Sequence, residues 1–338
     1  MSLAVRRGAR FTCHGDGVCC SDVHALGPLS SKERARVAGV AKESVTTHPR
    51  LGLPVLATRD AHCTYFEGDR GCALHRERGA AFKPLACRRF PFSVVATPKG
   101  RRLATAHRCP CRSVGERAVL EGAPLLRDLR RAKADLHVAG RVALTKRRRV
   151  GFERYAMLEA PLLDRLLGGS LGASAAMDAP LPEPAFAVLS DVALAHRSMV
   201  DGTSSGAAMA WFGDALLAEA TGTRVAARQS PFARGFDRAE RRSPSGNAGD
   251  AFDDFAADVV FGLSWTEESS LGELLVRLEI ALRCARRLAA RSPRREDVAL
   301  AEAVAVVEVA MSGPFGHIAF KAEDEAAALV RHDVVPRR

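Results

Sequence analysis

Eight of the nine cysteines in this 338-residue chain lie between positions 13 and 111, and this clustering is the strongest constraint on how the first third can fold. They are Cys13, Cys19, Cys20, Cys63, Cys72, Cys87, Cys109 and Cys111, and the ninth is Cys284. The N-terminus lacks the apolar segment of a secretory signal, and no stretch approaches the roughly 18 uncharged apolar residues that span a bilayer. We therefore expect a cytoplasmic protein without a membrane partner. In that reducing compartment, clustered cysteines favour metal binding over disulfides.

The number of cysteines is enough for two four-thiolate centres, whether zinc sites or iron–sulfur clusters. Cys19 and Cys20 are adjacent, so one small tetrahedral site cannot easily take both with good geometry. They are expected to serve different ions or one larger cluster. Glycines at positions 15 and 17 allow the tight turn that brings neighbouring thiolates together. Cys284 lies away from the leucine stripe of a predicted helix and is expected to be structural or incidental.

The order of the motifs around the cysteines is specific. FTCHGDGVCC at residues 11–20 is followed by CTYFEGDRGCALH, KPLACRRFPF and a late cysteine pair. Over about residues 11–115 this succession resembles the YkgJ-like cysteine-cluster family, described as a zinc- or iron-chelating domain. The most specific segment is residues 83–92, which is similar to the family's Arg/Lys-Pro-x-x-Cys-Arg-x-Phe-Pro-Phe. The resemblance implies that the protein holds zinc or iron.

One position departs from that family. Its first motif runs Cys-x2-Cys-x2-Cys-Cys, and Asp16 stands where the second cysteine would be. Two roles are open for Asp16, which can be a carboxylate ligand to zinc or iron or can cap the turn between its neighbouring glycines. Five histidines near the cysteines are further candidate ligands, at positions 14, 24, 62, 75 and 107, with His14 and His75 the preferred ones.

The distribution of glycine, proline, cysteine and periodic apolar residues along the chain predicts a mainly α protein in two parts. Residues 1–115 are expected to form an irregular, metal-ordered, cysteine-rich domain, with a Ser-capped helix after Ser30 and a strand at residues 93–97. Residues 116–338 are expected to form an all-helical domain with a flexible loop near residues 223–250. Helical spacing of apolar residues predicts the helices 116–167, 187–221, 250–263, 269–291 and 295–312.

Charge is unevenly divided between the two parts. Residues 1–150 contain 30 Lys and Arg against 12 Asp and Glu, a balance of +18, whereas residues 151–338 have a balance of −7. The two parts should therefore face different partners or each other. A basic first half that includes residues 146–149 makes nucleic-acid binding a third-ranked function.

Metal binding is the favoured function, with a metal ion as the partner. The overall plan, a cysteine domain followed by helices, also resembles that of the flagellin lysine-N-methylases. That resemblance implies the alternative, which is a protein lysine N-methyltransferase that uses S-adenosylmethionine and acts on a protein substrate.

Overall fold

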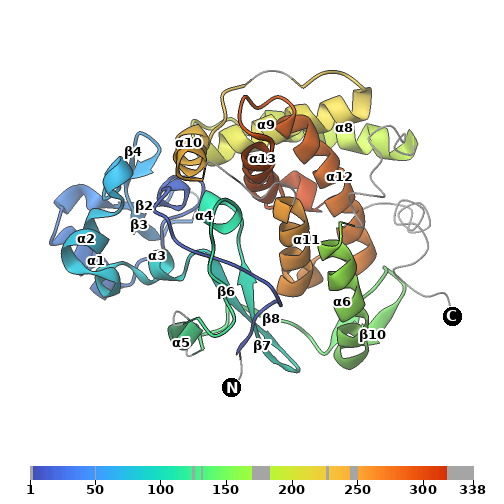
Figure 1. Cartoon of the computed structure of the whole chain (residues 1–338), viewed down its shortest axis with the longest axis horizontal. Coiled ribbons are helices and arrows are strands. Elements are labelled where there is room, and N and C mark those ends of the chain that lie inside the picture. The colour runs from blue at the N-terminus through green and yellow to red at the C-terminus, as the bar shows by residue number, and fades with distance from the viewer. Residues whose placement is uncertain are drawn as a thin grey trace.

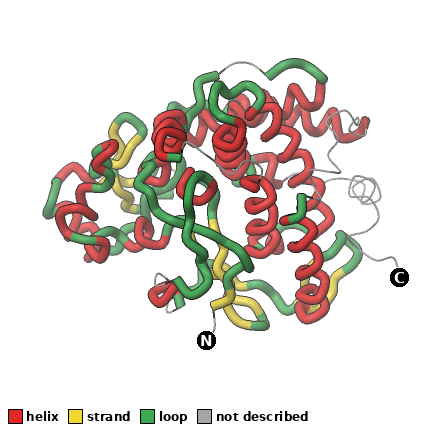
Figure 2. Tube along the Cα trace, viewed as in Figure 1, coloured by secondary structure: helices red, strands yellow, loops and turns green. Residues whose placement is uncertain are grey.

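A computed structural model of the chain describes residues 3–49, 51–123, 126–130, 132–169, 183–225, 228–243 and 250–317. Figure 1 and Figure 2 show a small lobe of short elements on one side, a small sheet in the middle and a body of packed helices on the other side. Helices dominate the described residues, which confirms the prediction of a mainly α protein. Of the described helices, none combines the length and the apolarity that a membrane span needs.

The small lobe, residues 20–91, is built from short helices and two-stranded ribbons. Its helices are α1 (Ser31–Ala38), α2 (Ala73–Arg78) and α3 (Leu85–Arg89), and its strands are β2 (Val45–Thr47), β3 (Pro54–Leu56), β4 (Thr58–Arg59) and β5 (His62–Cys63). Helix α1 begins as predicted, since Ser30 and Glu33 cap each other's backbone amides. Glu33 also accepts a hydrogen bond from the amide of Leu85 (2.7 Å), and this contact ties α1 to α3.

The central sheet has four strands in the order β1-β7-β6-β8. They are β1 (Leu3–Ala4), β6 (Phe92–Thr97), β7 (Gly100–Thr105) and β8 (Leu136–His137). The predicted strand at 93–97 is confirmed as β6, which forms an antiparallel hairpin with β7. Strands β1 and β8 add in parallel to the two sides of this hairpin, so segments far apart in sequence meet in one sheet.

The helical body consists of α6 (Phe152–Leu167), α8 (Glu183–Arg197), α9 (Ser204–Thr221), α10 (Ala233–Arg242), α11 (Asp250–Gly262), α12 (Leu271–Ala289) and α13 (Glu296–Ala310). Helices α9 and α13 are buried on almost every face, because small and β-branched apolar residues run round both of them. Helix α12 starts at a second capping box, made by Ser270 and Glu273. The helices predicted at 250–263, 269–291 and 295–312 are confirmed as α11, α12 and α13.

Three expectations about the second part were wrong. The described residues of the range 116–151 form no long helix: they contain the single turn α5 (Leu126–Leu129), strand β8 and the hairpin of β9 (Arg141–Ala143) and β10 (Arg149–Gly151). The helical spacing of the leucines near residue 126 lasts only one turn, and Val142 and Val150 are then buried as strand residues. The basic run at 146–149 lies at the turn of this hairpin and not on a helix.

The other two errors concern a helix that is divided and a helix that lies in a predicted loop. The predicted helix 187–221 is divided into α8 and α9 near Gly202, which has a positive φ of 79°, and α9 restarts at the cap residue Thr203. The predicted loop near 223–250 contains helix α10, because Phe232, Phe236 and Ala239 form a buried stripe at helical spacing. Of the paired arginines expected in a loop, Arg241 is exposed and Arg242 is half-buried. Residues 226–227 and 244–249 of that predicted loop lie outside the described residues.

The largest hydrophobic core joins the two parts of the chain. It contains many side chains of the helical body together with Val18, Val23, Val95 and Val114 from the first 115 residues. The small lobe has its own, much smaller cluster, centred on Leu26, Leu29, Val37, Leu56, Tyr65 and Leu74. The first cysteine motif therefore lies between a large core and a small one.

We predict that His196 makes the stability of the body depend on pH. His196 is fully buried, and its Nε2 accepts a hydrogen bond from the amide of Phe315 (2.9 Å). Burial lowers the pKa of His196 from 6.5 to about 4. The unfolded chain therefore binds the proton first, and the free energy of unfolding should fall by up to about 2–3 kcal/mol between pH 6.5 and pH 4.

The variant His196→Gln keeps a neutral acceptor and should lose this part of the pH dependence, measured by urea unfolding at several pH values. The difference between the two proteins is the diagnostic quantity. Glu279 and Glu308 have pKa values raised to about 7, chiefly by burial, and their effect on stability has the opposite sign. Equal pH profiles for the two proteins would contradict the prediction.

Candidate metal centre

Four cysteines meet in the small lobe, and we call them the lobe thiols: Cys20, Cys63, Cys72 and Cys87. Each is positioned by a different element: Cys20 ends a 3-10 turn, Cys63 ends β5, Cys72 precedes α2 and Cys87 lies within α3. All four pack on the same small hydrophobic cluster. The short elements of the lobe thus bring together cysteines that are up to 67 positions apart in sequence.

The lobe thiols affect one another electrostatically. Burial, together with the neighbouring thiols of Cys20, Cys87 and Cys72, raises the pKa of Cys63 to about 12. The pKa of Cys87 is likewise raised to about 12, first by burial and then by Cys20. Burial disfavours the ammonium of Lys83, yet the thiols of Cys72, Cys20 and Cys87 raise its pKa overall. Lys83 is therefore the positive charge of this group.

The other four cysteines meet where the small lobe joins the helical body, and we call them the interface thiols: Cys13, Cys19, Cys109 and Cys111. Cys109 precedes α4 (Pro110–Ser113) and Cys111 lies in it, and both are buried in the large core. Cys19 packs against the same core, whereas Cys13 is exposed. The interface group thus has one thiol open to solvent.

Cys111 is the central sulfur of the interface thiols. Hydrogen bonds from the thiols of Cys109 and Cys13 lower the pKa of Cys111, against the opposing effect of burial. The backbone amide of His14 also donates to its sulfur (3.2 Å). The same contacts raise the pKa of Cys13 and of Cys109, because each is the donor to Cys111. A hydrogen bond to Cys109 raises the pKa of Cys19, and a hydrogen bond from the adjacent Cys20 acts in the opposite direction.

Helix α10 holds the loop that carries Asp16. Arg242 donates to Oδ2 of Asp16 (2.6 Å), and Nε of Arg238 donates to its backbone carbonyl (3.1 Å). The guanidinium of Arg238 also lies over the ring of Phe66, 5.2 Å from its centroid, in a cation–π contact. Burial, followed by the nearby Cys111, raises the pKa of Asp16 to about 6. The sulfur of Cys111 lies 3.5 Å from the carboxylate of Asp16, which thus links the interface thiols to α10.

A buried ion network fixes α4 to α11. Arg112, which is fully buried, donates to Asp254 (3.0 Å) and to Asp258 of α11. Arg6 pairs with the same two carboxylates, and Nε2 of His107 lies 2.8 Å from Asp258. Because unpaired buried charges cost several kcal/mol, this network holds α4 and its two cysteines in one place. Residues Asp254 and Asp258 were not identified from the sequence, although two carboxylates four apart in an apolar helix were a usable signal.

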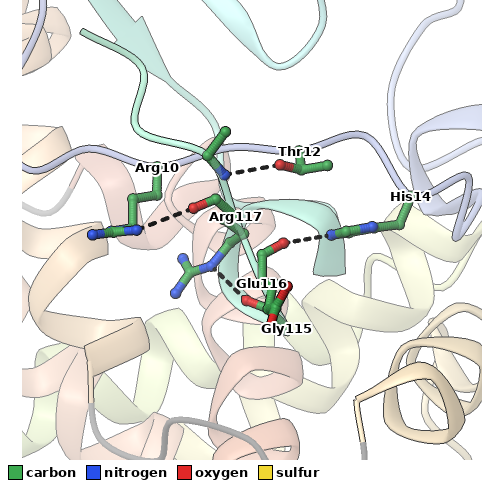
Figure 3. Close-up of a pocket in the computed structure, with 7 residues that line it drawn as sticks. Arg10, Thr12, His14, Gly115, Glu116 and Arg117 are labelled. Atoms are coloured by element: carbon green, nitrogen blue, oxygen red, sulfur yellow. Dashed lines mark hydrogen bonds between the residues drawn. The ribbon is translucent and has the colours of Figure 1, made fainter.

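An open pocket lies beside the interface thiols and is lined by Arg10, Thr12, His14, Gly115, Glu116, Arg117 and Ala118 (Figure 3). Here the segment before Cys13 pairs with the segment after α4. The amide of Phe11 donates to the carbonyl of Ala118 (2.9 Å), and Arg10 donates to that of Arg117 (3.2 Å). This pairing brings Cys13 close to Cys111, which is 98 positions away in sequence.

The candidate histidines have other contacts. Nε2 of His14 lies 3.1 Å from the carbonyl oxygen of Glu116 (Figure 3), and His75 is exposed on α2. His24 and His62 stack on phenylalanine rings, at 4.8 Å and 5.3 Å between centroids, and His107 belongs to the ion network.

Within the described ranges, no group of three or more His, Cys, Asp or Glu side chains is arranged as a metal site. Closing on one ion would therefore require the sulfurs of a group to move together.

Cys284 is fully buried in α12, in the helical body. Burial raises the pKa of its thiol, and its nearest charges are those of Glu219, Arg287 and Arg283. It belongs to neither thiol group, in accord with the structural or incidental role expected for it.

Comparisons with known proteins find no match for this chain among family models, curated proteins or solved structures. The likeness to the YkgJ-like family therefore rests on the motifs of residues 11–115.

We predict that Gly235→Ala separates α10 from the first cysteine motif. A Cβ at position 235 would lie 2.2 Å from Cγ2 of Val18 and 3.3 Å from the carbonyl oxygen of Asp16. Alanine normally favours a helix over glycine by up to about 1 kcal/mol. Here the overpacking should dominate and lower the free energy of unfolding by about 1–3 kcal/mol.

The matched control is Gly140→Ala, because a Cβ there meets nothing within 4 Å and the backbone φ is not positive. It should change the free energy of unfolding by less than about 0.5 kcal/mol, as typical surface substitutions do. Both values come from urea unfolding of the full chain. A stabilised Gly235→Ala protein would mean that α10 does not pack tightly on the motif.

Proposed function

We propose that this protein binds zinc or iron through the cysteine thiolates of residues 13–111, and that the metal orders the small lobe. The observation that carries the proposal is the gathering of eight cysteines from six separate stretches of chain into two groups of four. Four thiolates are the donor set of structural zinc sites and of common iron–sulfur clusters. All eight are free thiols, so a disulfide framework does not account for their grouping.

The surroundings of both groups suit a thiolate centre. Four thiolates and one divalent ion carry a net charge of −2, and nearby cations stabilise that charge. Lys83 supplies one beside the lobe thiols, and Arg242 and Arg238 lie beside the loop of the interface thiols. Phe90 and Phe66 add apolar cover near the two groups, which limits the access of water.

The size of the lobe supports a structural role for the metal. Its own cluster has seven buried residues, one of which is Cys63, and its helices are no longer than eight residues. So small a core rarely stabilises a fold alone, and small domains of this kind commonly depend on metal ligands. The helical body has a large core and does not need such help.

The identity of the metal can be determined on the purified protein. Anaerobic purification, elemental analysis and a visible spectrum separate the two metals, since iron–sulfur clusters absorb visible light and zinc thiolates do not. Near-stoichiometric zinc or iron in the purified chain is expected. A chain without bound metal, which also takes up none from added zinc or ferrous ion under reducing conditions, would contradict the proposed function.

We predict that metal removal loosens the small lobe first. Under a strong chelator, amide hydrogen exchange across residues 20–91 should rise by at least tenfold, because the ligand bonds replace a missing core. Helices α9, α12 and α13 should keep their protection. Hydrogen exchange with mass spectrometry on the full chain measures both.

The control for this experiment is Cys284→Ser, which should retain the metal content and the exchange pattern of the natural chain. The same exchange in the lobe with and without chelator would show that the cysteines do not order it. Metal loss in Cys284→Ser would show that the helical body supplies a ligand.

A further inference from the structure

Two adjacent residues, Cys19 and Cys20, belong to different thiol groups. The thiol of Cys19 interacts directly with Cys109 and packs against the large core. Cys20 packs against the small cluster of the lobe, with the other lobe thiols. Its thiol also donates a hydrogen bond to Cys19, so the two groups approach each other at this adjacent pair. Both residues lie in the 3-10 turn Val18–Cys20, where successive side chains point about 120° apart, so one thiol can pack on the large core and the next on the lobe cluster.

The two groups are also anchored by different parts of the fold. The lobe thiols depend on the short elements β5, α2 and α3 of the small lobe. The interface thiols depend on α4, which the ion network fixes to α11, and on the loop that α10 holds through Asp16. Each group has four sulfurs and its own cations, so each is a complete donor set by itself.

We infer that the chain holds two separate metal centres, a lobe centre at Cys20, Cys63, Cys72 and Cys87 and an interface centre at Cys13, Cys19, Cys109 and Cys111. This inference rests on the proposed function and adds the division of the ligands. Asp16 is no ligand in this assignment: its carboxylate holds Arg242, and the interface set has four sulfurs without it. The one exposed thiol of the interface centre, Cys13, lies in sequence between Thr12 and His14, which line the open pocket of Figure 3.

The test counts zinc in pairs of cysteine variants. The full chain is loaded with zinc under reducing conditions, separated from free ion over a moderate chelator and analysed for zinc. The natural chain and Cys284→Ser should each retain about two zinc ions, since each centre takes four thiolates. Cys19→Ser and Cys20→Ser, which alter adjacent positions, should each retain about one.

Two double variants decide between separate centres and one shared cluster. Cys19→Ser with Cys111→Ser removes two ligands of the same centre and should still leave about one zinc ion. Cys19→Ser with Cys63→Ser removes one ligand from each centre and should leave almost none. Equal zinc in these two double variants, or loss of both ions in a single variant, would overturn the division.

A cobalt titration of the natural chain gives a readout that needs no variant. Sulfur-to-cobalt charge-transfer absorbance should rise linearly until about two equivalents of cobalt have been added, because each four-thiolate set takes one ion. Saturation at one equivalent would overturn the two-centre inference while leaving metal binding intact. A natural chain that takes up neither zinc nor cobalt would instead contradict the proposed function itself.

Discussion

The arrangement of this protein depends on the ion pairs made by the buried guanidinium of Arg112. It lies in the short helix α4, next to Cys111, and pairs with Asp254 and Asp258 of α11. A fully buried charge is tolerated only with partners of this kind, so α4 has one stable position relative to the helical body. That position sets two cysteines at the edge of the large core, where the chain around Cys13 and Cys19 can reach them. The helical body therefore fixes the position of the interface thiols, although all four lie in the first 115 residues of the chain.

The uneven distribution of charge along the sequence leads to ion pairs between the two parts of the chain. Basic residues of the first 150 positions pair with carboxylates of the second part, as in Arg102–Glu159 (2.7 Å) and Lys146–Glu273 (3.2 Å). Of the two outcomes expected from the charge, that the parts face different partners or each other, the second is found at these contacts. Arg102 and Lys146 are therefore paired with carboxylates of the same chain. These ion pairs add to the shared hydrophobic core in holding the two parts of the chain together.

Several features could be predicted from the sequence because their causes are local. The capped start of α1, strand β6 and helices α11 to α13 follow from Ser–Glu capping, β-branched residues and helical spacing, all of which act within a few residues. The failures occurred where distant contacts decide the structure. Leu136 pairs with Val95 in the sheet, which no local pattern of residues 116–151 reveals. Helix α10 was missed because its arginines are typical of a loop, while its buried stripe needs Val18 and the large core to pack against.

The same limit applied to the cysteines. Their number predicted up to two four-thiolate centres, and the adjacency of Cys19 and Cys20 suggested that they serve different ions or one larger cluster. Which cysteines go together depends on contacts such as Cys13 with Cys111 and Cys20 with Cys63, which the fold alone determines. For Asp16, the sequence left a ligand and a turn residue as equal choices. The pair that it forms with Arg242 could not be expected, because the arginine lies 226 positions later, in a helix that was not predicted.

We propose that metal is held by sulfur alone, in sets of four. X-ray absorption fine structure at the metal edge of the loaded full chain tests this most directly, because it reports the number, type and distance of the ligand atoms. The account predicts a single shell of about four sulfur atoms, at about 2.3 Å for zinc, with no nitrogen or oxygen shell. A shell of nitrogen or oxygen at about 2.0–2.1 Å that supplies one or more of the four ligands would contradict it.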